Sequence, residues 1–284
     1  FHPASSTPSR AYTDPLWGTL KNSPPATVNG SACTCAQILG PTTYAPSLMA
    51  ESKLEPKAEP KAEPKTEPAK AVQGIVERWF PQHREDFVFV PIPKDPGGDV
   101  FEIESSSGKV VVRGNDGVAM ASGLNWYLKY YCKVNITYFA SQMKLPQVLP
   151  EVPSKIRQVS PYKYRYIFNY CAFSYSLAWL NWPQWERLID YMAFHGINMP
   201  LSVTGQEAVW REVYRKLGLS DQQINEFFTG AAFLPFGWMG CVDGWGGPLP
   251  ESWFAKRVEL QKKILTRERS FGMTPVLQGF TGHV

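Results

Sequence analysis

Apolar positions first recur at regular spacing about a quarter of the way along the chain. Val72, Ile75 and Trp79 fall on one face of a helix. The run DVFEIESSSGKVVVRG, at 99–114, predicts two strands around a Ser-Ser-Gly turn, and the stretch GVAMASGLNWYLKYYCKVN after it predicts an amphipathic helix. We therefore expect residues 71–155 to form a small α+β domain, and no spacing within it indicates catalysis.

From Pro161 the pattern changes, and apolar or aromatic runs alternate with amphipathic stretches. The runs predict strands, namely KYRYIFNYCAFSYS at 163–176, GINMPLSVTG at 196–205 and MTPVLQGFTGHV at 273–284. The amphipathic stretches predict four helices. The first follows the cap Asn181, and the second spans 207–218. The third follows the capping box of Ser220 and Gln223, and the fourth spans 251–272. A Trp- and Gly-rich loop, FLPFGWMGCVDGWGGPLP, is expected at 233–250.

This order of strands and helices is typical of parallel strands joined by helical crossovers. The first strand is not followed by a glycine-rich phosphate fingerprint, which argues against a dinucleotide-binding fold. A (β/α)8 barrel takes about 250 residues, and residues 156–284 are about half of that. We expect an α/β protein in which the first part of such a barrel, about three strands, follows the small domain, and hence a truncated chain. Pro200 and Pro275 conflict with their strands unless each occupies a bulge or a strand start.

Residues 1–70 contain no regular apolar pattern. They are rich in Pro, Ser and Thr, and then repeat Glu, Pro and Lys in LEPKAEPKAEPKTEPAK. Because each proline blocks helix formation and the charges balance, we expect a disordered tail that ends in an extended, solvated linker. The alternative is a recognition tail.

Charge and composition narrow the function classes. The 29 basic and 25 acidic residues give a net charge of +4 without a basic cluster, which argues against nucleic-acid binding. A stretch of about 18 consecutive apolar residues is absent, so we expect no membrane span. The five cysteines include the pair Cys33 and Cys35, but a second pair to complete a metal site is missing, so neither a metal nor another cofactor is expected.

Long runs of the second half resemble a known family. The stretch from KYRYIFNYCAFSYS through GQEAVW, INEFFTG and FGWMG, continued by GPLPESW and RSFGMTPVLQGFTGHV, resembles the alpha-N-acetylglucosaminidases of glycoside hydrolase family 89. The resemblance covers roughly residues 71–284. It implies a small N-terminal domain, a catalytic (β/α)8 barrel, and exo-hydrolysis of terminal α-linked N-acetylglucosamine from glycans such as heparan sulfate. A non-catalytic carbohydrate-binding or regulatory module is the alternative, which an open half barrel with unpaired strand edges disfavours.

The resemblance also implies a retaining mechanism. Retention requires two carboxyl groups about 5–5.5 Å apart, one acting as acid/base and the other as nucleophile. The family motifs that carry them are expected C-terminal to Val284, so no catalytic residue is expected in this chain. Glu207, a carboxylate at a predicted strand end, is a weak catalytic candidate, and a structural role at a helix N-terminus is favoured.

The resemblance further implies a sugar pocket at the strand ends. Asn169 and Cys171 match family positions that line it, although Cys171 can equally be a small buried filler. Phe236 falls where the family carries a tryptophan, which leaves the stacking contact open. The full set of substrate-binding candidates is Asn169, Cys171, Tyr175, Gln206, Glu207, Phe236 and His283.

Two sequons, at Asn29 and Asn135, are candidate glycosylation sites. They support a secretory route weakly, and the lysosomal and secreted members of the family support it better. We therefore expect a lysosomal or secreted protein. Its expected partner is a glycan with a terminal α-N-acetylglucosamine. We expect it to bind neither nucleic acid nor a membrane. A homo-oligomer of the full-length protein is left open.

Overall fold

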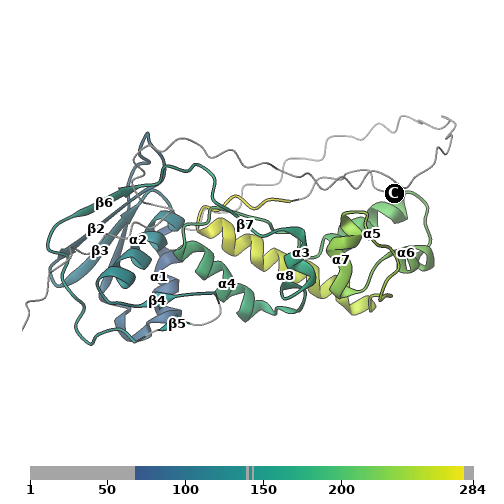
Figure 1. Cartoon of the computed structure of the whole chain (residues 1–284), viewed down its shortest axis with the longest axis horizontal. Coiled ribbons are helices and arrows are strands. Elements are labelled where there is room, and N and C mark those ends of the chain that lie inside the picture. The colour runs from purple at the N-terminus through teal and green to yellow at the C-terminus, as the bar shows by residue number, and fades with distance from the viewer. Residues whose placement is uncertain (1–67, 139–140, 143, 278–284) are drawn as a thin grey trace, which may run out of the picture. The chain divides into compact units, whose positions relative to one another are not determined.

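The computed structural model describes residues 68–138, 141–142 and 144–277. The expected tail therefore lies almost wholly outside the described residues, except that helix α1 (Pro68–Trp79) begins three residues before the expected start at Ala71. A four-stranded sheet follows α1, with β1 (Phe87–Pro91), β2 (Val100–Ser106), β3 (Lys109–Gly114) and β6 (Ile156–Val159) in the order β1-β3-β2-β6. Helix α2 (Gly117–Tyr130) packs on β2 and β3 (Figure 1).

The predicted hairpin and helix of this domain are confirmed. β2 and β3 pair antiparallel across Ser107 and Gly108, which adopt φ angles of 51° and 74°. Asp116 then caps α2 by accepting a hydrogen bond from the Ala119 amide at 2.8 Å. Gly123 allows α2 to lie close to the sheet, because a Cβ there would come within 2.8 Å of Val112.

Two strands of the sheet were not anticipated. β1 pairs parallel with β3, and its run FVFVP has a half-buried face without clear alternation. β6 pairs antiparallel with β2, so the sheet extends to Val159, past the boundary expected after residue 155. A separate short pair, β4 (Asn135–Ile136) and β5 (Ser141–Gln142), lies between α2 and β6 in the chain.

The second part of the chain begins the strand and helix alternation. β7 (Tyr166–Ile167) pairs parallel with β8 (Met199–Pro200), and Leu201 bridges in parallel to Val276. Three neighbouring parallel segments are thus present, as expected, although β7 and β8 are shorter than the sequence suggested. The part of the third run beyond residue 277 lies outside the described residues.

The long strand predicted at 163–176 is wrong. The chain leaves the extended conformation after Ile167, because Phe168 adopts a φ of 75° and Asn169 caps a helix. This helix, α3 (Tyr170–Ser174), is followed by the 3-10 turn η2 (Leu177–Trp179). The aromatic content that suggested a strand instead packs α3, where the Phe173 ring lies 6.1 Å from Phe168.

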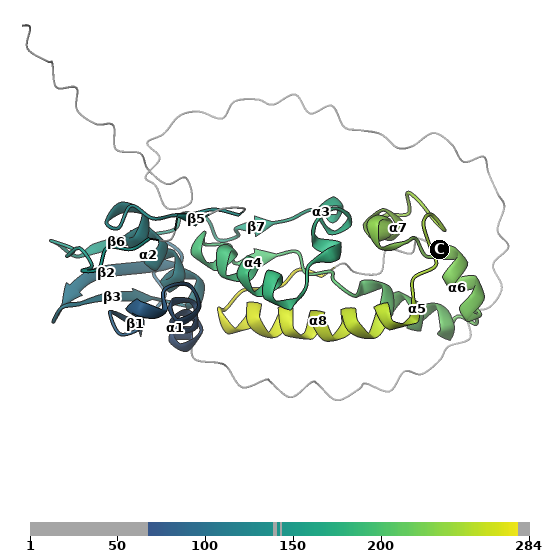
Figure 2. The same ribbon diagram turned by 90° about the horizontal axis from the view of Figure 1, so that it is seen from below.

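The other helices agree with their predicted signals. α4 (Trp182–Phe194) and α6 (Asp221–Phe227) both begin with complete capping boxes, at Asn181 and at Ser220. α5 (Gln206–Lys216) and α8 (Glu251–Ser270) follow, and α8 runs beside α4 (Figure 2). The loop expected at 233–250 needs correction, since it contains the end of the turn η3 (Ala231–Phe233) and all of helix α7 (Leu234–Trp238). This helix carries Pro235 in its first turn.

The register of the parallel segments explains how Pro200 is tolerated. On one edge the Leu201 amide donates to the Ile167 carbonyl of β7 at 3.1 Å. On the other edge Ser202 donates to the Val276 carbonyl at 2.9 Å, and Val276 donates to the Pro200 carbonyl at 2.8 Å. Because amides alternate between the edges, Pro200 lacks only one donor toward the third segment.

Pro275 is accommodated differently. The amides of its neighbours Thr274 and Val276 both point toward the β8 segment, at 2.8 Å from the carbonyls of Asn198 and Pro200. The nitrogen of Pro275 therefore lies on the opposite edge, so it removes no hydrogen bond to β8.

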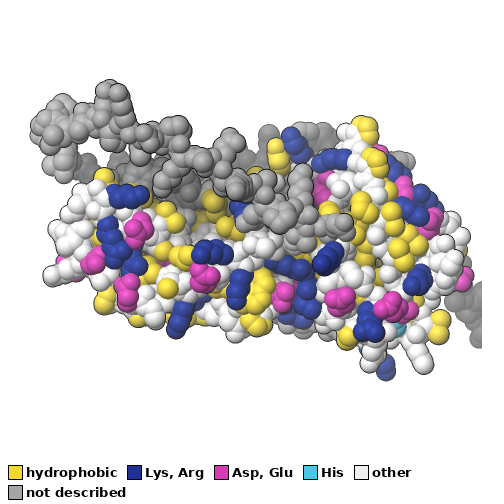
Figure 3. All heavy atoms as spheres, turned by 180° about the vertical axis from the view of Figure 1, so that it is seen from behind, with side chains coloured by type: hydrophobic (Ala, Val, Ile, Leu, Met, Phe, Trp, Pro, Cys, Tyr) yellow, Lys and Arg dark blue, Asp and Glu magenta, His cyan; other side chains and the backbone are white. Residues whose placement is uncertain are grey.

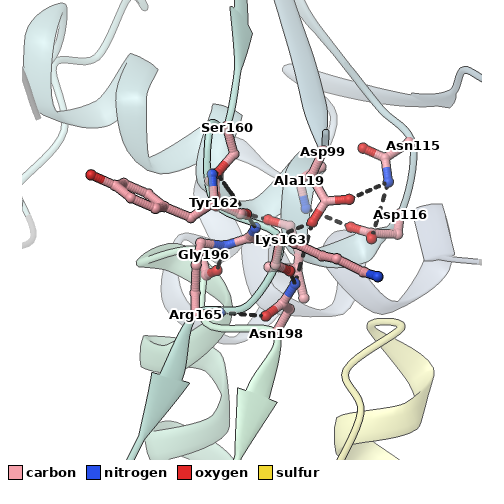
Figure 4. A network of polar contacts seen from close by, with 12 residues as sticks. Asp99, Asn115, Asp116, Ala119, Ser160, Tyr162, Lys163, Arg165, Gly196 and Asn198 are labelled. Atoms are coloured by element: carbon pink, nitrogen blue, oxygen red, sulfur yellow. Dashed lines mark hydrogen bonds and ion pairs between the residues drawn. The ribbon is translucent and has the colours of Figure 1, made fainter. Parts of the chain in front are cut away.

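Two buried polar clusters join the parts of the fold. In the first, Asp190 of α4 is fully buried and accepts hydrogen bonds from Arg78 and Trp79 of α1 and from Arg267 of α8, at 2.8–3.0 Å. In the second, Arg165 and Asp99 pair beneath the starts of β7 and β8 (Figure 4). Both clusters tie the N-terminal sheet and helices to the strand and helix alternation.

Candidate functional site

Three of the candidate sugar-binding residues, Asn169, Gln206 and Glu207, follow the ends of the parallel strands β7 and β8. This end of the strands is the active face of a (β/α)8 barrel. β7 ends at Ile167, and Asn169 follows as the N-cap of α3. Its side-chain oxygen accepts a hydrogen bond from the Ala172 amide at 3.0 Å. Among the described residues the Asn169 amide nitrogen has no acceptor, and the side chain is exposed. Asn169 therefore holds the helix with one end of its amide and presents a hydrogen-bond donor with the other.

The residue before it, Phe168, adopts a left-handed backbone conformation with φ of 75°. Such a conformation in a bulky residue costs on the order of 1 kcal/mol, and strained residues of this kind cluster at functional sites. The strain has a local consequence, because it turns the chain out of the strand and directs Asn169 into the first turn of α3. The left-handed backbone at Phe168, which ends the strand before Asn169, could not be predicted from the sequence alone.

The other candidates of this segment are less constrained. Tyr175 follows α3 and is 65% exposed, so its ring is available to stack on a ligand. Cys171 is a half-buried free thiol within α3. The structure therefore places Asn169 and Tyr175 at the surface.

Gly205, Gln206 and Glu207 follow the second strand, as expected. Gly205 begins α5 with a φ of 76°, and a Cβ at this position would lie 3.0 Å from the Arg257 carbonyl oxygen. This close approach and the left-handed backbone both require glycine. Gln206 is half-buried in the first turn of α5, whereas Glu207 points inward.

Glu207 is the buried carboxylate of the site, with 1% of its surface exposed. One oxygen accepts a hydrogen bond from the Trp253 indole at 2.6 Å, and the other oxygen has no partner among the described residues. Burial raises the pKa of Glu207, a shift that the Trp253 hydrogen bond and Arg257 only partly oppose. A carboxyl group enclosed in this way is not exposed to a sugar at the surface.

A cavity of about 20 Å³ lies next to Glu207, bounded by Phe173, Thr204 and Trp238. This is about the space of one water molecule, which needs roughly 10–15 Å³. The cavity connects α3, α5 and α7 and is too small for a sugar ring.

The remaining candidates are dispersed. Phe236 lies half-buried in α7, which packs against α3. His283 and the sequon residue Asn29 lie outside the described residues. Asn135, in β4, is exposed and so accessible to glycosylation.

Trp253 and Arg257 were not anticipated as site residues. Arg257 stacks on the Trp253 ring at 4.1 Å and donates hydrogen bonds to the carbonyls of Ala178 and Leu180. The signal available in the sequence was their spacing, since residues four apart on a predicted helix share a face. Within residues 68–277 as described, no three His, Cys, Asp or Glu side chains are grouped to hold a metal ion. No helix of the same residues is long and apolar enough to cross a membrane.

These features match one family of sugar-cleaving proteins in both parts of the chain. The alpha-N-acetylglucosaminidase (NAGLU) N-terminal domain matches residues 70–151, and the alpha-N-acetylglucosaminidase (NAGLU) tim-barrel domain matches residues 165–284. The chain therefore belongs to the alpha-N-acetylglucosaminidase family of glycoside hydrolases, and its fold is a small N-terminal domain with the first units of a barrel.

Individual relatives agree with this assignment. Human alpha-N-acetylglucosaminidase is 46% identical over 221 residues, which cover 76% of this chain and 30% of the human protein. A family 89 glycoside hydrolase from Clostridium perfringens, solved with 2-acetamido-1,2-dideoxynojirmycin, is 38% identical with a TM-score of 0.74 over 76% of this chain and 25% of that one. A variant of the bacterial enzyme with two glutamates changed to glutamine was solved with its substrate GlcNAc-alpha-1,4-galactose. The chain thus spans less than a third of the length of these relatives.

Proposed function

We propose that this chain forms the N-terminal domain and the first barrel units of an exo-acting hydrolase of terminal α-linked N-acetylglucosamine. Membership of the family supports the reaction class, and the substrate complex of the bacterial relative supports the sugar. The main support for the proposal is the side chain of Asn169. Its oxygen caps α3, and this fixes its free amide donor at the end of β7. The sugar-bearing glycan is the partner of the protein in this account.

The proposed contribution of this chain is to bind and orient the terminal sugar. The Asn169 amide would donate to a sugar hydroxyl, and the exposed Tyr175 ring would pack on the sugar. Cys171, Gln206, Phe236 and His283 remain candidates for the rest of the pocket wall. Glu207 would support the wall from behind through its hydrogen bond to Trp253.

The two carboxyl groups of the reaction are assigned elsewhere. A retaining hydrolase needs an acid/base and a nucleophile about 5–5.5 Å apart beside the anomeric carbon. Glu207 cannot fill both roles, and its burial separates it from the surface. We therefore assign both groups to the part of the family length that this chain does not span.

A lysosomal or secreted location follows as part of the proposal. The exposed sequon at Asn135 is compatible with a secretory route. Occupancy of Asn135 can be measured by mass spectrometry of the protein from secreting eukaryotic cells, with Asn135→Gln as the control.

Hydrolysis of an aryl α-N-acetylglucosaminide tests the proposal. The 284-residue chain and a protein that carries this chain within a complete family-length sequence are assayed side by side. We expect turnover only from the family-length protein. Turnover by the 284-residue chain that disappears in Glu207→Gln would instead make Glu207 catalytic and would refute the assignment of the carboxyl groups.

A further inference from the structure

A pocket of about 170 Å³ lies between the end of α1, the segment that follows β4, and the helix α4. Three aromatic and three polar side chains line it, namely Trp79, Tyr138, Tyr191, Thr137, Gln184 and Arg187. We call this site the seam pocket. None of the candidate sugar-binding residues described above lines it.

The aromatic rings of the seam pocket are held in place by the fold. The Trp79 indole donates a hydrogen bond to the buried Asp190 at 3.0 Å, and its ring meets the Phe194 ring edge to face at 5.3 Å. The rings of Tyr138 and Tyr191 meet at 5.7 Å and 89°. A rigid ring offers a large contact area at little cost in conformational entropy, and the C–H face of a sugar packs well against such a surface.

The sequon Asn135-Ile136-Thr137 leads directly into the wall of this pocket. Ile136 is buried, whereas Asn135 is exposed and Thr137 is half-buried, so the side chains alternate as in an extended strand. Asn135 and Thr137 therefore project to the same side, roughly 7 Å apart along the strand. Because Thr137 lines the pocket, a sugar attached to the Asn135 side chain begins at the edge of the pocket.

The attachment point is also fixed relative to α4. The carbonyl oxygen of Ile136 lies 2.9 Å from Nε2 of His195, the C-cap of α4, and accepts its hydrogen bond. The His195 ring packs in turn on Tyr191, with ring centroids 4.4 Å apart. One wall of the pocket and the sequon are thus joined by direct contacts.

The size and polarity of the seam pocket fit one neutral sugar. Pockets that enclose a whole small ligand have roughly 300–1,000 Å³, so this smaller and open pocket fits one face of a sugar ring. Arg187 lies over the Trp79 ring at 4.1 Å, and both Arg187 and Gln184 are exposed. Their N–H groups can donate to the oxygens of an acetamido sugar. The described residues that line the pocket include no carboxylate.

Exposed apolar side chains alone are not evidence of a binding site. The face shown in Figure 3 carries hydrophobic side chains interspersed with lysine and arginine ones, and single apolar side chains are ordinary on a protein surface. The seam pocket differs because its three rings line one cavity and an attachment point for a sugar lies beside them.

We propose that the seam pocket binds the first N-acetylglucosamine of an N-linked glycan on Asn135, with the sugar ring on Trp79 and Tyr138 and its acetamido group beside Arg187. The ligand is thus part of the protein's own glycan and not a substrate. Its covalent link gives it a high effective concentration at the pocket, so contacts that are weak for a free sugar suffice. The inference rests on the secretory location proposed above.

Attachment of the glycan requires a donor that the secretory pathway supplies. The side-chain nitrogen of Asn135 forms a bond to the anomeric carbon of an oligosaccharide carried on a lipid diphosphate. The bond between that carbon and the diphosphate oxygen breaks, and the lipid diphosphate leaves with the electron pair. The proton lost by the amide passes to a base of the cell's glycosyltransferase.

Hydroxyl-radical footprinting of the family-length protein from secreting eukaryotic cells tests the proposal. Mass spectrometry measures the occupancy of Asn135 and the oxidation rates of individual side chains. We expect Asn135 to be occupied, and Trp79 and Tyr138 to be oxidised at least threefold more slowly than in Asn135→Gln. Tyr164, which is 64% exposed and does not line the pocket, should be oxidised at the same rate in both proteins.

A displaced glycan separates docking from a general effect of glycosylation. Ser107→Asn with Lys109→Thr, made in the Asn135→Gln protein, moves the sequon to the exposed turn between β2 and β3. A glycan at that turn should leave Trp79 and Tyr138 unprotected.

Variants of the wall test the contacts themselves. Tyr191→Ala should reduce the protection of Tyr138 at least twofold, where protection is the ratio of oxidation rates without and with the Asn135 glycan. Arg187→Ala changes an exposed residue, so the fold is retained, and it should have the same effect. Arg84→Ala, at an exposed position that does not line the pocket, is the matched control and should leave the protection unchanged.

Four results would overturn the proposal. Asn135 could be unoccupied in the secreted protein, Trp79 and Tyr138 could be oxidised equally with and without the glycan, the displaced glycan could protect them as well, or both wall variants could keep full protection. Hydrolysis of the aryl α-N-acetylglucosaminide is measured on the same samples. Hydrolysis without protection refutes the seam-pocket proposal alone, whereas protection without hydrolysis refutes the proposed function alone.

Discussion

The guanidinium of Arg165 donates a hydrogen bond to the carboxylate of Asp99 at 2.6 Å, and both side chains are almost completely buried. Arg165 precedes β7, whereas Asp99 precedes β2 of the N-terminal sheet. The pair therefore links the entrance of the first barrel strand to the small domain (Figure 4). The pair lies at the opposite end of β7 from Asn169. Residues at that end of a (β/α)8 barrel contribute to stability, whereas the active site lies at the other end.

The surroundings of the pair satisfy both charges. Arg165 also donates to the carbonyls of Tyr162 and Gly196, and Lys94 contacts Asp99 at 2.8 Å. Burial raises the pKa of Asp99, but Lys94 and Arg165 outweigh this effect and hold its pKa below the usual value. The carboxylate is therefore ionised and fully paired in the folded protein.

Arg165→Ala should destabilise the chain by about 3–5 kcal/mol, because it leaves the Asp99 charge buried without its main partner. The free energy of unfolding is measured by urea denaturation. Arg157→Ala is the matched control, since Arg157 pairs with the carboxylates of Asp95 and Glu102 but is 45% exposed. That change should cost about 1 kcal/mol or less. Equal losses for the two variants would contradict the role given to the buried pair.

The raised pKa of Glu268 leads us to expect that the stability of the protein depends on pH. It is fully buried and accepts hydrogen bonds from the Ser202 hydroxyl at 2.8 and 2.9 Å. Burial raises its pKa to about 8, against the effects of Ser202 and Arg269. The folded protein thus keeps a proton on Glu268 that the unfolded chain releases near pH 4.5. The contribution of Glu268 to stability is therefore greatest below that pH and falls as pH rises to about 8.

Glu268→Gln should remove this share of the pH dependence. The variant should gain on the order of 2–4 kcal/mol relative to the wild type at pH 8 and little at pH 5. Unfolding free energies at the two pH values provide the measurement, and Glu226→Gln on the exposed face of α6 controls for the chemical change. An equal effect of Glu268→Gln at both pH values would rule out this assignment.

Glu207 is predicted to be structural. Glu207→Gln keeps an oxygen for the Trp253 indole and should change stability by about 1 kcal/mol or less, with turnover of the family-length protein retained. Glu207→Ala leaves that indole without its acceptor and opens a cavity, so it should cost about 2–4 kcal/mol. Melting temperature and hydrolysis of the aryl α-N-acetylglucosaminide are measured together. Loss of turnover in Glu207→Gln at an unchanged melting temperature would make the carboxyl group functional.

The parts of the fold that could be predicted from the sequence depend on local signals. The capping residues Asn181 and Ser220 mark the starts of α4 and α6 because a cap acts within one helical turn. The strand predicted through Asn169 was wrong for a related reason. Its aromatic residues suited a strand, whereas the turn at Phe168 depends on packing that the local sequence does not reveal.

The long-range features could not be predicted in this way. Arg165 and Asp99 are 66 residues apart, and only the assembled fold brings them together. The stacking of Arg257 on Trp253 is local, but its place beside Glu207 again depends on the contact between α5 and α8. Asn169 was identified as a site candidate by resemblance, and the structure adds that its side chain is also a helix cap.

The dual role of Asn169 allows helix capping and sugar binding to be separated. Asn169→Asp keeps the oxygen that accepts from Ala172, and aspartate caps helices as well as asparagine does. It replaces the free amide donor with an acceptor, so only the proposed contact to the sugar is lost. Asn181→Asp makes the same change at the cap of α4 and is the matched control.

The most direct test is therefore kcat/KM of the family-length protein on an aryl α-N-acetylglucosaminide, measured for these two variants with melting temperature alongside. The account predicts that Asn169→Asp lowers kcat/KM about tenfold or more, equivalent to ~1.4 kcal/mol, while its melting temperature and the activity of Asn181→Asp stay unchanged. Unchanged kcat/KM in Asn169→Asp would contradict the placement of the terminal sugar at the end of β7.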